Sequence, residues 1–379
     1  MKYLRKLSRK KKIELLFVLL LVLMIAFLLF PSSRAFKNNT FLQEFRSEIS
    51  KQSLYVDSES IISFDALAKK VYDHTTESAL KQYMHDIDTF GDYFTPREYQ
   101  AFLEASNVNY AGVGMLLHKQ KNSDTIICLP LQEMPIERYS RLLAVDTKSV
   151  KDTNIYTISS WIRGQKGSHV ALEVKDLSGK IQTFNVERKA HYFSSVQWVK
   201  EGDQTMLQIV HFTQNTSAEL KAAVKLWPKD IPLIIDLRDN GGGDFLSAVK
   251  SADLFLPKNS KISSLHTREK QFDYYANNAD ILNDQAVILL QNHLTASAAE
   301  VFIAALTQNF RAQSLGEKSY GKGVAQKFIE MRDHSAIYLT YANILTPNGK
   351  SYHKKGLTAT YTHTLEDLLT EYIEEKIDD

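Results

Sequence analysis

One serine, Ser297, lies at a point in the sequence where a hydroxyl group could do chemistry. It stands in NHLTASAAEVFIAAL, Asn292 to Leu306, where a run of strand-type apolar residues gives way to a helical run. A serine at the start of a helix can simply cap it, by accepting hydrogen bonds from otherwise unpaired backbone amides. The same turn can present the hydroxyl as a nucleophile beside those free amides. From this stretch alone both interpretations stay open, and the second requires a nearby base.

A lysine is the strongest candidate for that base. Lys322 lies between Gly321 and Gly323 in GEKSYGKGVAQ, and Gln326 follows four residues later. A lysine flanked by glycines is also typical of an exposed loop, and it can deprotonate a serine only where its surroundings leave the amine neutral. The 11 histidines are scattered, and none stands in a context that points to the Ser297 turn. No His-Glu-x-x-His spacing occurs, so neither a metal nor another cofactor is expected.

A second turn in the sequence could stabilise negative charge. In LIIDLRDNGGGDFLSAVK, the strand-type run Leu233 to Leu237 is followed by three glycines and by a helix predicted to begin near Asp244. Glycines allow close approach of the backbone, and the first turn of a helix carries partial positive charge, so this turn suits a negative oxygen. A phosphate-binding loop is disfavoured, because no Gly-Lys-Ser/Thr follows and Asp244 would repel a phosphate. A purely structural turn is the alternative.

Three blocks of different periodicity have to position these residues. Helical spacing of three and four residues predicts a helical cap over residues 36–105. Alternating apolar residues over 110–189 predict a small β-rich domain, with a hairpin turn at Ser178–Lys180. Strand-type runs alternate with helical runs over 193–379, and this alternation predicts an α/β core.

The chain opens with a membrane or export signal. Residues 1–12 hold seven basic side chains and are predicted to be a cytoplasmic segment, and residues 13–30 are predicted to be a single transmembrane signal anchor. Cleavage near Ser33–Ala35 is the alternative, since small residues occur there at a suitable spacing. In both cases the rest of the chain is expected outside the cytoplasm, on the periplasmic or extracellular face.

Net charge and cysteine content exclude several classes of function. The net charge is +2, and the basic N-terminal segment supplies more than that excess, so the rest of the chain is slightly acidic and nucleic-acid binding is not expected. Cys128 is the single cysteine, which excludes an intrachain disulfide and a cysteine-based metal cluster.

Five stretches of the chain resemble a known family, the carboxyl-terminal processing peptidases, which are tail-specific serine–lysine proteases with an inserted PDZ domain. They occur in the order typical of that family: DTFGDYFTPREY, DLRDNGGG, TASAAEVFIAAL, GEKSYGKGVAQ and LTPNGKSYHKKGL. The intervals of 25 residues from Ser297 to Lys322 and of four from Lys322 to Gln326 also fit the family. The resemblance implies a ClpP/crotonase-like α/β protease core, an inserted PDZ-like domain and no cofactor.

The resemblance also implies a role for each candidate residue. Ser297 would be the nucleophile and Lys322 the general base, with Gln326 orienting the lysine amine. The backbone amides of Gly243 and Ala298 would form the oxyanion hole, which holds the negative oxygen of the tetrahedral intermediate.

In the β-rich domain, the loop AGVGM would hold the C-terminal carboxylate of a substrate, whose tail would add to the domain as a strand. The loop residues concerned are Gly112, Val113, Gly114 and Met115. The domain departs from the family pattern, because it is several residues shorter than usual after MPIERY. The glycine turn departs as well, with Gly241 where the family has proline.

We therefore predict a membrane-anchored, exported serine endopeptidase that cleaves proteins near their C-terminal tails. Its partners would be proteins or peptides with accessible C-termini. A catalytically idle scaffold that binds tails through its PDZ-like domain is the alternative. A crotonase-type acyl-coenzyme A enzyme shares a related core, but the export signal and the Ser/Lys pair argue against it. The sequence leaves open the physiological substrate, the formation of a homo-oligomer, and whether Glu300 serves the site or is simply an acidic residue in the first turn of a helix.

Overall fold

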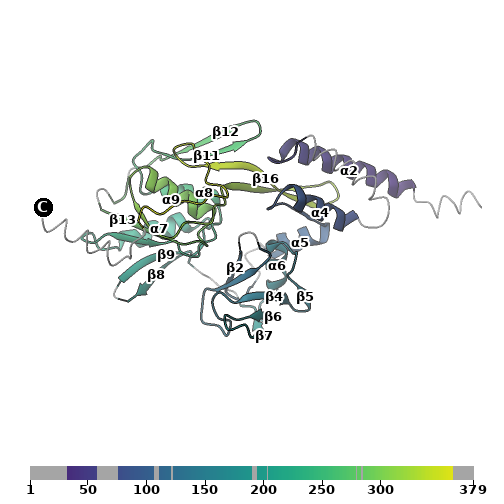
Figure 1. Ribbon diagram of the computed structural model, residues 1–379, viewed down its shortest axis with the longest axis horizontal. Coiled ribbons are helices and arrows are strands. Elements are labelled where there is room, and N and C mark those ends of the chain that lie inside the picture. Colours follow the sequence, from purple (N-terminus) through teal and green to yellow (C-terminus); the bar gives the residue numbers. More distant parts are fainter. Residues whose placement is uncertain are drawn as a thin grey trace, which may run out of the picture.

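The computed structural model of the chain describes residues 32–57, 76–105, 111–120, 123–189, 194–202, 204–278, 280–282 and 285–361 (Figure 1). The predicted cytoplasmic segment 1–12 and the predicted signal anchor 13–30 lie outside these residues. Within the described ranges, no helix has both the length and the apolar character that crossing a membrane requires.

The N-terminal part packs helices against a strand from the far end of the chain. α2 (Ser32–Gln52), α4 (Thr76–Ile87) and α5 (Pro96–Ala105) are helical, as the residue spacing predicts. Buried side chains of α2 and α4 form one apolar cluster with Ile337 and Leu339 of β16 (Ala336–Leu345). A short strand, β1 (Asp92–Phe94), interrupts the predicted helical cap, because it pairs antiparallel with β16 and so satisfies its buried backbone groups.

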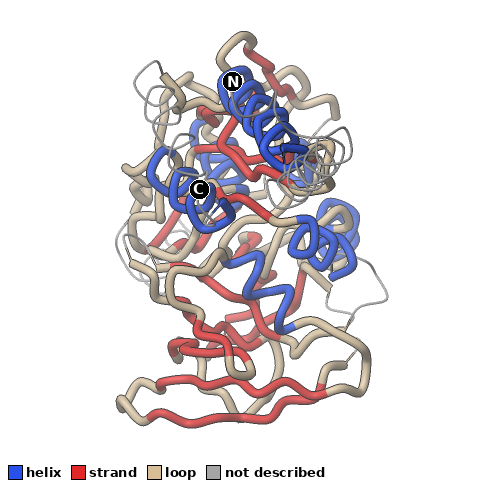
Figure 2. The backbone as a smooth tube through the Cα atoms, turned by 90° about the vertical axis from the view of Figure 1, so that its right-hand side faces the viewer, coloured by secondary structure: helices blue, strands red, loops and turns tan. Residues whose placement is uncertain are grey.

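Residues 111–189, which we call the β-module, have an apolar core of their own. Their six strands form one sheet in the order β2-β3-β4-β6-β7, with β5 paired to β4. The β-module occupies the lower part of Figure 2. The strands are β2 (Met115–Lys119), β3 (Ile126–Pro130), β4 (Arg141–Val145), β5 (Lys148–Ser149), β6 (His169–Lys175) and β7 (Ile181–Glu187). The predicted hairpin joins β6 to β7. A helix that the alternating pattern did not predict, α6 (Ile155–Ile162), buries Ile158 and Ile162 in the same core.

A mostly parallel sheet forms the centre of the α/β part, in the order β14-β13-β10-β9-β8. Its strands are β8 (Val196–Glu201), β9 (Gln204–Ile209), β10 (Leu233–Asp236), β13 (Val287–Gln291) and β14 (Gln313–Gly316). Successive residues of a strand face opposite sides, so Leu233 and Ile235 pack in the main core, while Ile234 joins a smaller cluster on the other face.

Three helices cover the face of the central sheet that carries the main core. They are α7 (Thr216–Lys225), α8 (Phe245–Asp253) and α9 (Ala298–Gln308), at the positions where helical periodicity predicts them (Figure 1). A second, antiparallel sheet lies beside them, with the order β1-β16-β11-β12 and with β15 paired to β16. It consists of β1, β16, β11 (Lys261–Thr267), β12 (Gln271–Tyr275) and β15 (Val324–Glu330).

Candidate active site

The two turns singled out in the sequence lie at the same edge of the central sheet. β10 and β13 are parallel neighbours, with Asp236 opposite Leu290. The glycine turn follows β10 and the Ser297 turn follows β13, so both leave from carboxyl ends of adjacent strands. Such an edge is where open α/β sheets build their binding sites.

Ser297 is the residue that precedes α9, and its backbone is unusual for a residue with a side chain. Its φ is 57° and its ψ is −118°. Positive φ costs a non-glycine residue on the order of 1–3 kcal/mol, so the surrounding contacts must hold this conformation in place. One of them is Gly242, where a Cβ atom would lie only 2.7 Å from the Cβ of Ser297. The glycine turn and the Ser297 turn are therefore packed directly against each other.

Two backbone amides beside Ser297 are available to a ligand. Among the described residues, none accepts a hydrogen bond from the amide of Gly243 or of Ala298. The conformation of Gly243, with φ at 129°, is accessible only to glycine, and a Cβ there would lie 2.9 Å from Nε2 of His211. Two free amides next to a hydroxyl are the donors that an oxyanion hole requires.

Glu300 connects the Ser297 turn to the loop that carries Lys322. Its carboxylate is fully buried, and Oε2 accepts hydrogen bonds from the backbone amides of Ser297 and Lys322, each at 2.8 Å. Oε1 accepts from the Ser319 hydroxyl at 2.6 Å and from the Gly321 amide at 2.7 Å. Burial raises the pKa of Glu300, although these four hydrogen bonds oppose that rise. Glu300 is therefore more than an acidic residue in the first turn of a helix.

The side chain of Lys322 points to a different partner from the one its predicted role requires. Its Nζ lies 5.0 Å from the centre of the Phe90 ring, which is within the range of a cation–π contact. No hydrogen bond between Ser297 Oγ and Lys322 Nζ occurs in the described structure. The backbones of the two residues are thus joined through Glu300, whereas their side chains are not.

Gln326 belongs to a chain of hydrogen bonds that runs away from the site. Its side-chain amide donates to Oγ1 of Thr340 at 3.1 Å, and that hydroxyl donates to Asp88 at 3.0 Å. Asp88 also accepts from the Thr340 backbone amide at 2.6 Å. Burial raises the pKa of Asp88, and the hydrogen bonds that it accepts partly offset the rise. Because the side-chain NH2 group of Gln326 donates to Thr340, the side-chain oxygen Oε1 of Gln326 is directed away from that hydroxyl.

Two histidines that the sequence did not connect with the site lie against the glycine turn. His118, on β2 of the β-module, is buried, and its Nδ1 would lie 3.4 Å from a Cβ at Gly241. Its ring also meets the ring of Tyr320 edge-on, at 5.6 Å. His211 follows β9 and approaches Gly243 as described above. No local signal could have found them, because each reaches the turn from a distant element.

The surroundings of both histidines disfavour the protonated imidazole. Desolvation lowers the pKa of His118 to about 4. Desolvation also lowers the pKa of His211 to about 4, with a further contribution from the positive charge of Arg163.

The predicted carboxylate-binding loop lies in the β-module, at the start of β2. Gly112 exchanges two backbone hydrogen bonds with Lys189, at 3.1 and 2.8 Å. Among the described residues, none accepts from the amides of Val113 and Gly114. Gly114 has φ at 75° and lies against the Gln132 side chain, and Met115 begins β2.

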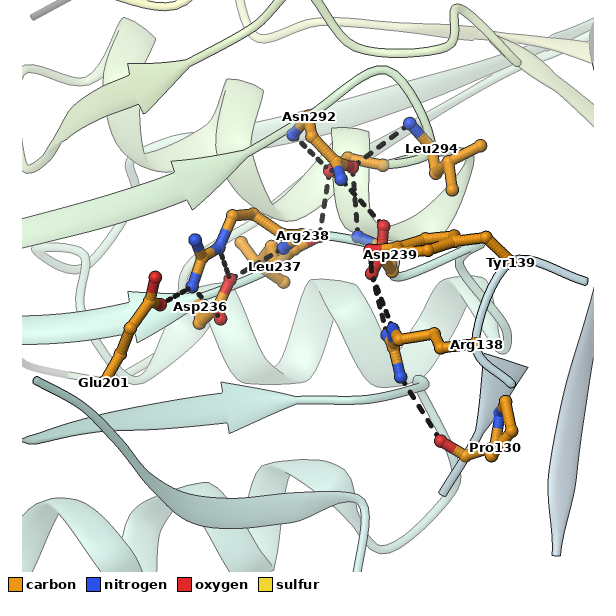
Figure 3. A network of polar contacts seen from close by, with 11 residues as sticks. Pro130, Arg138, Tyr139, Glu201, Asp236, Leu237, Arg238, Asp239, Asn292 and Leu294 are labelled. Atoms are coloured by element: carbon orange, nitrogen blue, oxygen red, sulfur yellow. Dashed lines mark hydrogen bonds and ion pairs between the residues drawn. The ribbon is translucent and has the colours of Figure 1, made fainter. Parts of the chain in front are cut away.

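The end of β10 is held by an ion pair between the buried Asp236 and the partly exposed Arg238. Asp236 accepts from the backbone amide of Arg238 at 2.9 Å and from its guanidinium at 2.9 and 3.0 Å, and Glu201 binds the same guanidinium (Figure 3). These bonds fix the chain where it leaves the strand and enters the glycine turn.

Across the described ranges, no group of three or more His, Cys, Asp or Glu side chains could hold a metal ion.

Comparison with known proteins relates the α/β core of this chain to a peptidase family. Residues 203–363 match the model of peptidase family S41. The chain is 31% identical over 303 residues to a probable CtpA-like serine protease of Staphylococcus epidermidis, a match that covers 77% of this chain and 61% of the relative. It is 29% identical over 313 residues to a protein of the same description from Staphylococcus aureus, covering 80% and 62%. The chain therefore spans less than two thirds of the length of these curated relatives.

Among solved structures, the photosystem II D1 C-terminal processing protease has the same fold. The TM-score is 0.72, over 86% of this chain and 93% of that structure, at 21% sequence identity. A lipoprotein from Streptococcus agalactiae is a more distant structural relative, with a TM-score of 0.53 at 10% identity. With the family match over residues 203–363, these findings confirm the resemblance read from the motifs, a similarity to the carboxyl-terminal processing peptidases of peptidase family S41.

Proposed function

We propose that this chain is a serine endopeptidase in which Ser297 is the nucleophile and Lys322 the general base. The observation that carries the proposal is the close packing of the two turns, which brings Gly242 against Ser297. The amides of Gly243 and Ala298, which follow these two residues in the chain, have no acceptor among the described residues. The hydrogen bonds from Ser297 and Lys322 to one carboxylate, that of Glu300, support the pairing of these two residues.

The reaction would proceed through an acyl-enzyme. The neutral Lys322 amine would take the Ser297 proton as Oγ attacks the peptide carbonyl, and the two amides would hold the resulting oxyanion. The C–N bond would then break as Lys322 returns the proton to the leaving amine, and water would hydrolyse the ester. Before the first step the Lys322 amine has to come within hydrogen-bond distance of Ser297 Oγ.

Three further parts of the proposal concern the setting of this reaction. The β-module would act as a PDZ-like domain, in which the free amides of Val113 and Gly114 receive the carboxylate of a substrate tail. Residues 13–30 would anchor the chain in the membrane, and the remainder would work outside the cytoplasm. Cleavage near the C-termini of substrate proteins follows from the tail-binding role of the module.

One observation favours a second candidate function. Because the Ser297 hydroxyl and the Lys322 amine are not hydrogen-bonded, a catalytically idle scaffold that binds protein tails also fits the structure. The two candidates differ in whether Ser297 is needed for cleavage.

A comparison of serine variants tests the proposal. The full-length chain, purified in a mild detergent, would be incubated with fluorescein-labelled casein as wild type, as Ser297→Ala and as Ser217→Ala. Ser217 is a matched control, since it lies in the first turn of α7 on the same sheet. We expect Ser297→Ala to lose cleavage and Ser217→Ala to keep it. A wild type that binds tails but never cleaves would support the scaffold instead.

A further inference from the structure

One carboxylate, that of Asp239, joins three segments of the chain at the site (Figure 3). Its Oδ2 accepts hydrogen bonds from Arg138 Nη2 and from the Tyr139 hydroxyl, each at 2.7 Å. Its Oδ1 accepts from the side-chain amide of Asn292 at 2.7 Å, while its backbone amide donates to Asn292 Oδ1 at 3.0 Å. We call these four residues the Asp239 network.

The first segment of the network belongs to the β-module. Arg138 and Tyr139 lie in the connection between β3 and β4, where the sequence is shorter than the family pattern. Arg138 Nη1 also donates to the carbonyl of Pro130 at 3.2 Å, and the Tyr139 amide donates to the carbonyl of Cys128 at 2.9 Å. These bonds fix the Arg138 side chain and the Tyr139 backbone to β3, so the network is anchored to a strand of the module.

The second and third segments are the two turns of the proposed active site. Asp239 is the residue before Asn240, whose side chain accepts from the Gly242 amide at 2.8 Å and whose carbonyl accepts from the Ala296 amide at 2.9 Å. Asn292 opens the Ser297 turn. A displacement of Asp239 would therefore move the glycine turn and the Ser297 turn together.

The backbone of Asp239 shows that its contacts have to hold it in place. Its φ is 63°, a conformation that costs a residue with a side chain about 1–2 kcal/mol. Burial alone would raise the pKa of Asp239, but the hydrogen bonds from Arg138, Asn292 and Tyr139 outweigh burial and lower the pKa. The carboxylate is thus ionised at neutral pH and able to accept all three side-chain bonds.

From this geometry we infer that Arg138 and Tyr139 are positioning residues. By binding Asp239, they allow the β-module to hold the glycine turn and the Ser297 turn in fixed positions relative to each other. The inference rests on the proposed function, because it concerns the alignment of the same nucleophile. It requires no contact between Arg138 or Tyr139 and the substrate. Loss of the network would accordingly lower kcat more than it raises KM.

The test uses the full-length protein in detergent and fluorescein-labelled casein. Arg138→Gln removes the charge from a side chain that is 40% exposed, so the fold should tolerate it. Tyr139→Phe removes a single hydroxyl. The matched control is Tyr156→Phe, because the Tyr156 hydroxyl also bridges the β-module to the rest of the chain, at 2.7 Å from the Tyr338 hydroxyl, but touches neither turn.

We expect Arg138→Gln to lower kcat about 10-fold and Tyr139→Phe about 3-fold, with KM within about 2-fold of wild type, as suits the loss of one or two charge-assisted hydrogen bonds. For Tyr156→Phe, both kcat and KM should stay within about 2-fold of wild type. The kcat of Arg138→Lys, which retains one charged donor, should lie between those of wild type and Arg138→Gln. In an Asp239→Asn background, Arg138→Gln should cost nothing further, because the two residues act as a unit.

Three results would overturn the inference while the proposed function stands: an unchanged kcat in Arg138→Gln, an equal loss in Tyr156→Phe, or a full additional loss in the Asp239→Asn background. Absence of cleavage by the wild type would instead reject the proposed function. Thermal melting of each variant separates a loss of alignment from a loss of folded protein.

Discussion

The two sides of the site, one with the proposed nucleophile Ser297 and the other with the proposed base Lys322, are built in different ways. We call them the nucleophile side and the base side. On the nucleophile side, the Ser297 backbone is fixed by Gly242 and by the bond of its amide to Glu300. On the base side, Glu300 fixes only the backbone of Lys322, while the amine lies over the Phe90 ring. The backbone is thus held on both sides, but the Lys322 amine makes no hydrogen bond to the Ser297 hydroxyl in the described structure.

The difference shows which parts of such a site have to be rigid. Amides that receive a negative oxygen stabilise it well only if they are already in place, since reorientation during the reaction would cost the energy that they contribute. A lysine side chain has a long flexible stem, so it can reach its partner after the substrate arrives. Variants can therefore be chosen to damage one side and spare the other.

The largest expected effect is on the base side, in Lys322→Arg. Arginine keeps the positive charge and the contact with Phe90, but it cannot give up its proton to accept one from Ser297. We expect casein cleavage to fall by at least about 1,000-fold, as in Lys322→Ala, because general bases contribute about 10²–10⁴-fold. The melting temperature should stay close to that of the wild type. An active Lys322→Arg enzyme would mean that another residue is the base.

The next largest effect is expected from Glu300→Gln, because this change weakens the hydrogen bonds that connect the two sides. Three of the four donors that Glu300 receives are backbone amides, so the NH2 group of a glutamine would face amide donors in a buried site. Each buried donor left unpaired costs about 1–3 kcal/mol. We expect kcat/KM to fall on the order of 100-fold, the size of effect that a lost oxyanion donor produces, together with a lower midpoint in urea unfolding.

Glu219→Gln is the matched control for that experiment. Glu219 also accepts several hydrogen bonds, among them the Ser195 amide at 2.7 Å and the Ser195 hydroxyl at 2.6 Å, but it lies outside the site. The Glu219→Gln variant should be less stable than the wild type, but its activity per folded molecule should be unchanged. Equal loss of activity in both variants would show that Glu300 acts only through general stability.

A smaller effect is expected from Thr340→Val, which removes the hydroxyl between Gln326 and Asp88. Without it, the Gln326 amide loses the acceptor that sets its orientation, and we expect kcat for casein to fall about 5-fold, the size of one lost hydrogen bond. Thr340→Ser should restore most of the rate. The same change in a Gln326→Ala background should have no further effect, and strict additivity would show that Thr340 does not act through Gln326.

The smallest effect concerns His118 and the pH dependence of stability. Desolvation lowers its folded-state pKa to about 4, whereas an unfolded histidine has a pKa of about 6.5. Between these values the unfolded chain binds a proton that the folded chain does not, so stability falls as pH decreases from about 6.5 to 4. In His118→Gln, the free energy of unfolding, measured with urea at a series of pH values, should fall less steeply over this pH window than in the wild type. An identical slope would mean that His118 becomes protonated in the folded state near its ordinary pKa.

Local patterns were sufficient for the elements that carry the site. The alternation of strand-type and helical runs predicted β10, β13, α8 and α9, because side-chain periodicity is a property of the segment itself. Elements that depend on a distant partner were missed. β1 forms because β16, more than 200 residues later in the chain, offers it hydrogen bonds, and α6 is too short for its periodicity to stand out from the strands around it.

The sequence by itself determined the residue types and their order: a serine at a strand-to-helix turn, a glycine turn after a buried strand, and a lysine between glycines. Only the tertiary structure decided which of them meet. Glu300 could not be distinguished from an ordinary acidic residue of a first helix turn until the structure showed the lysine loop bonded to its carboxylate. Asp239 stands in the DLRDNGGG stretch and Arg138 in MPIERY, but the sequence assigned no role to either residue or to His118. The reason is that hydrogen bonds and desolvation depend on distances of a few ångströms, and for residues 20 to 120 positions apart those distances are set by the packing of the sheets.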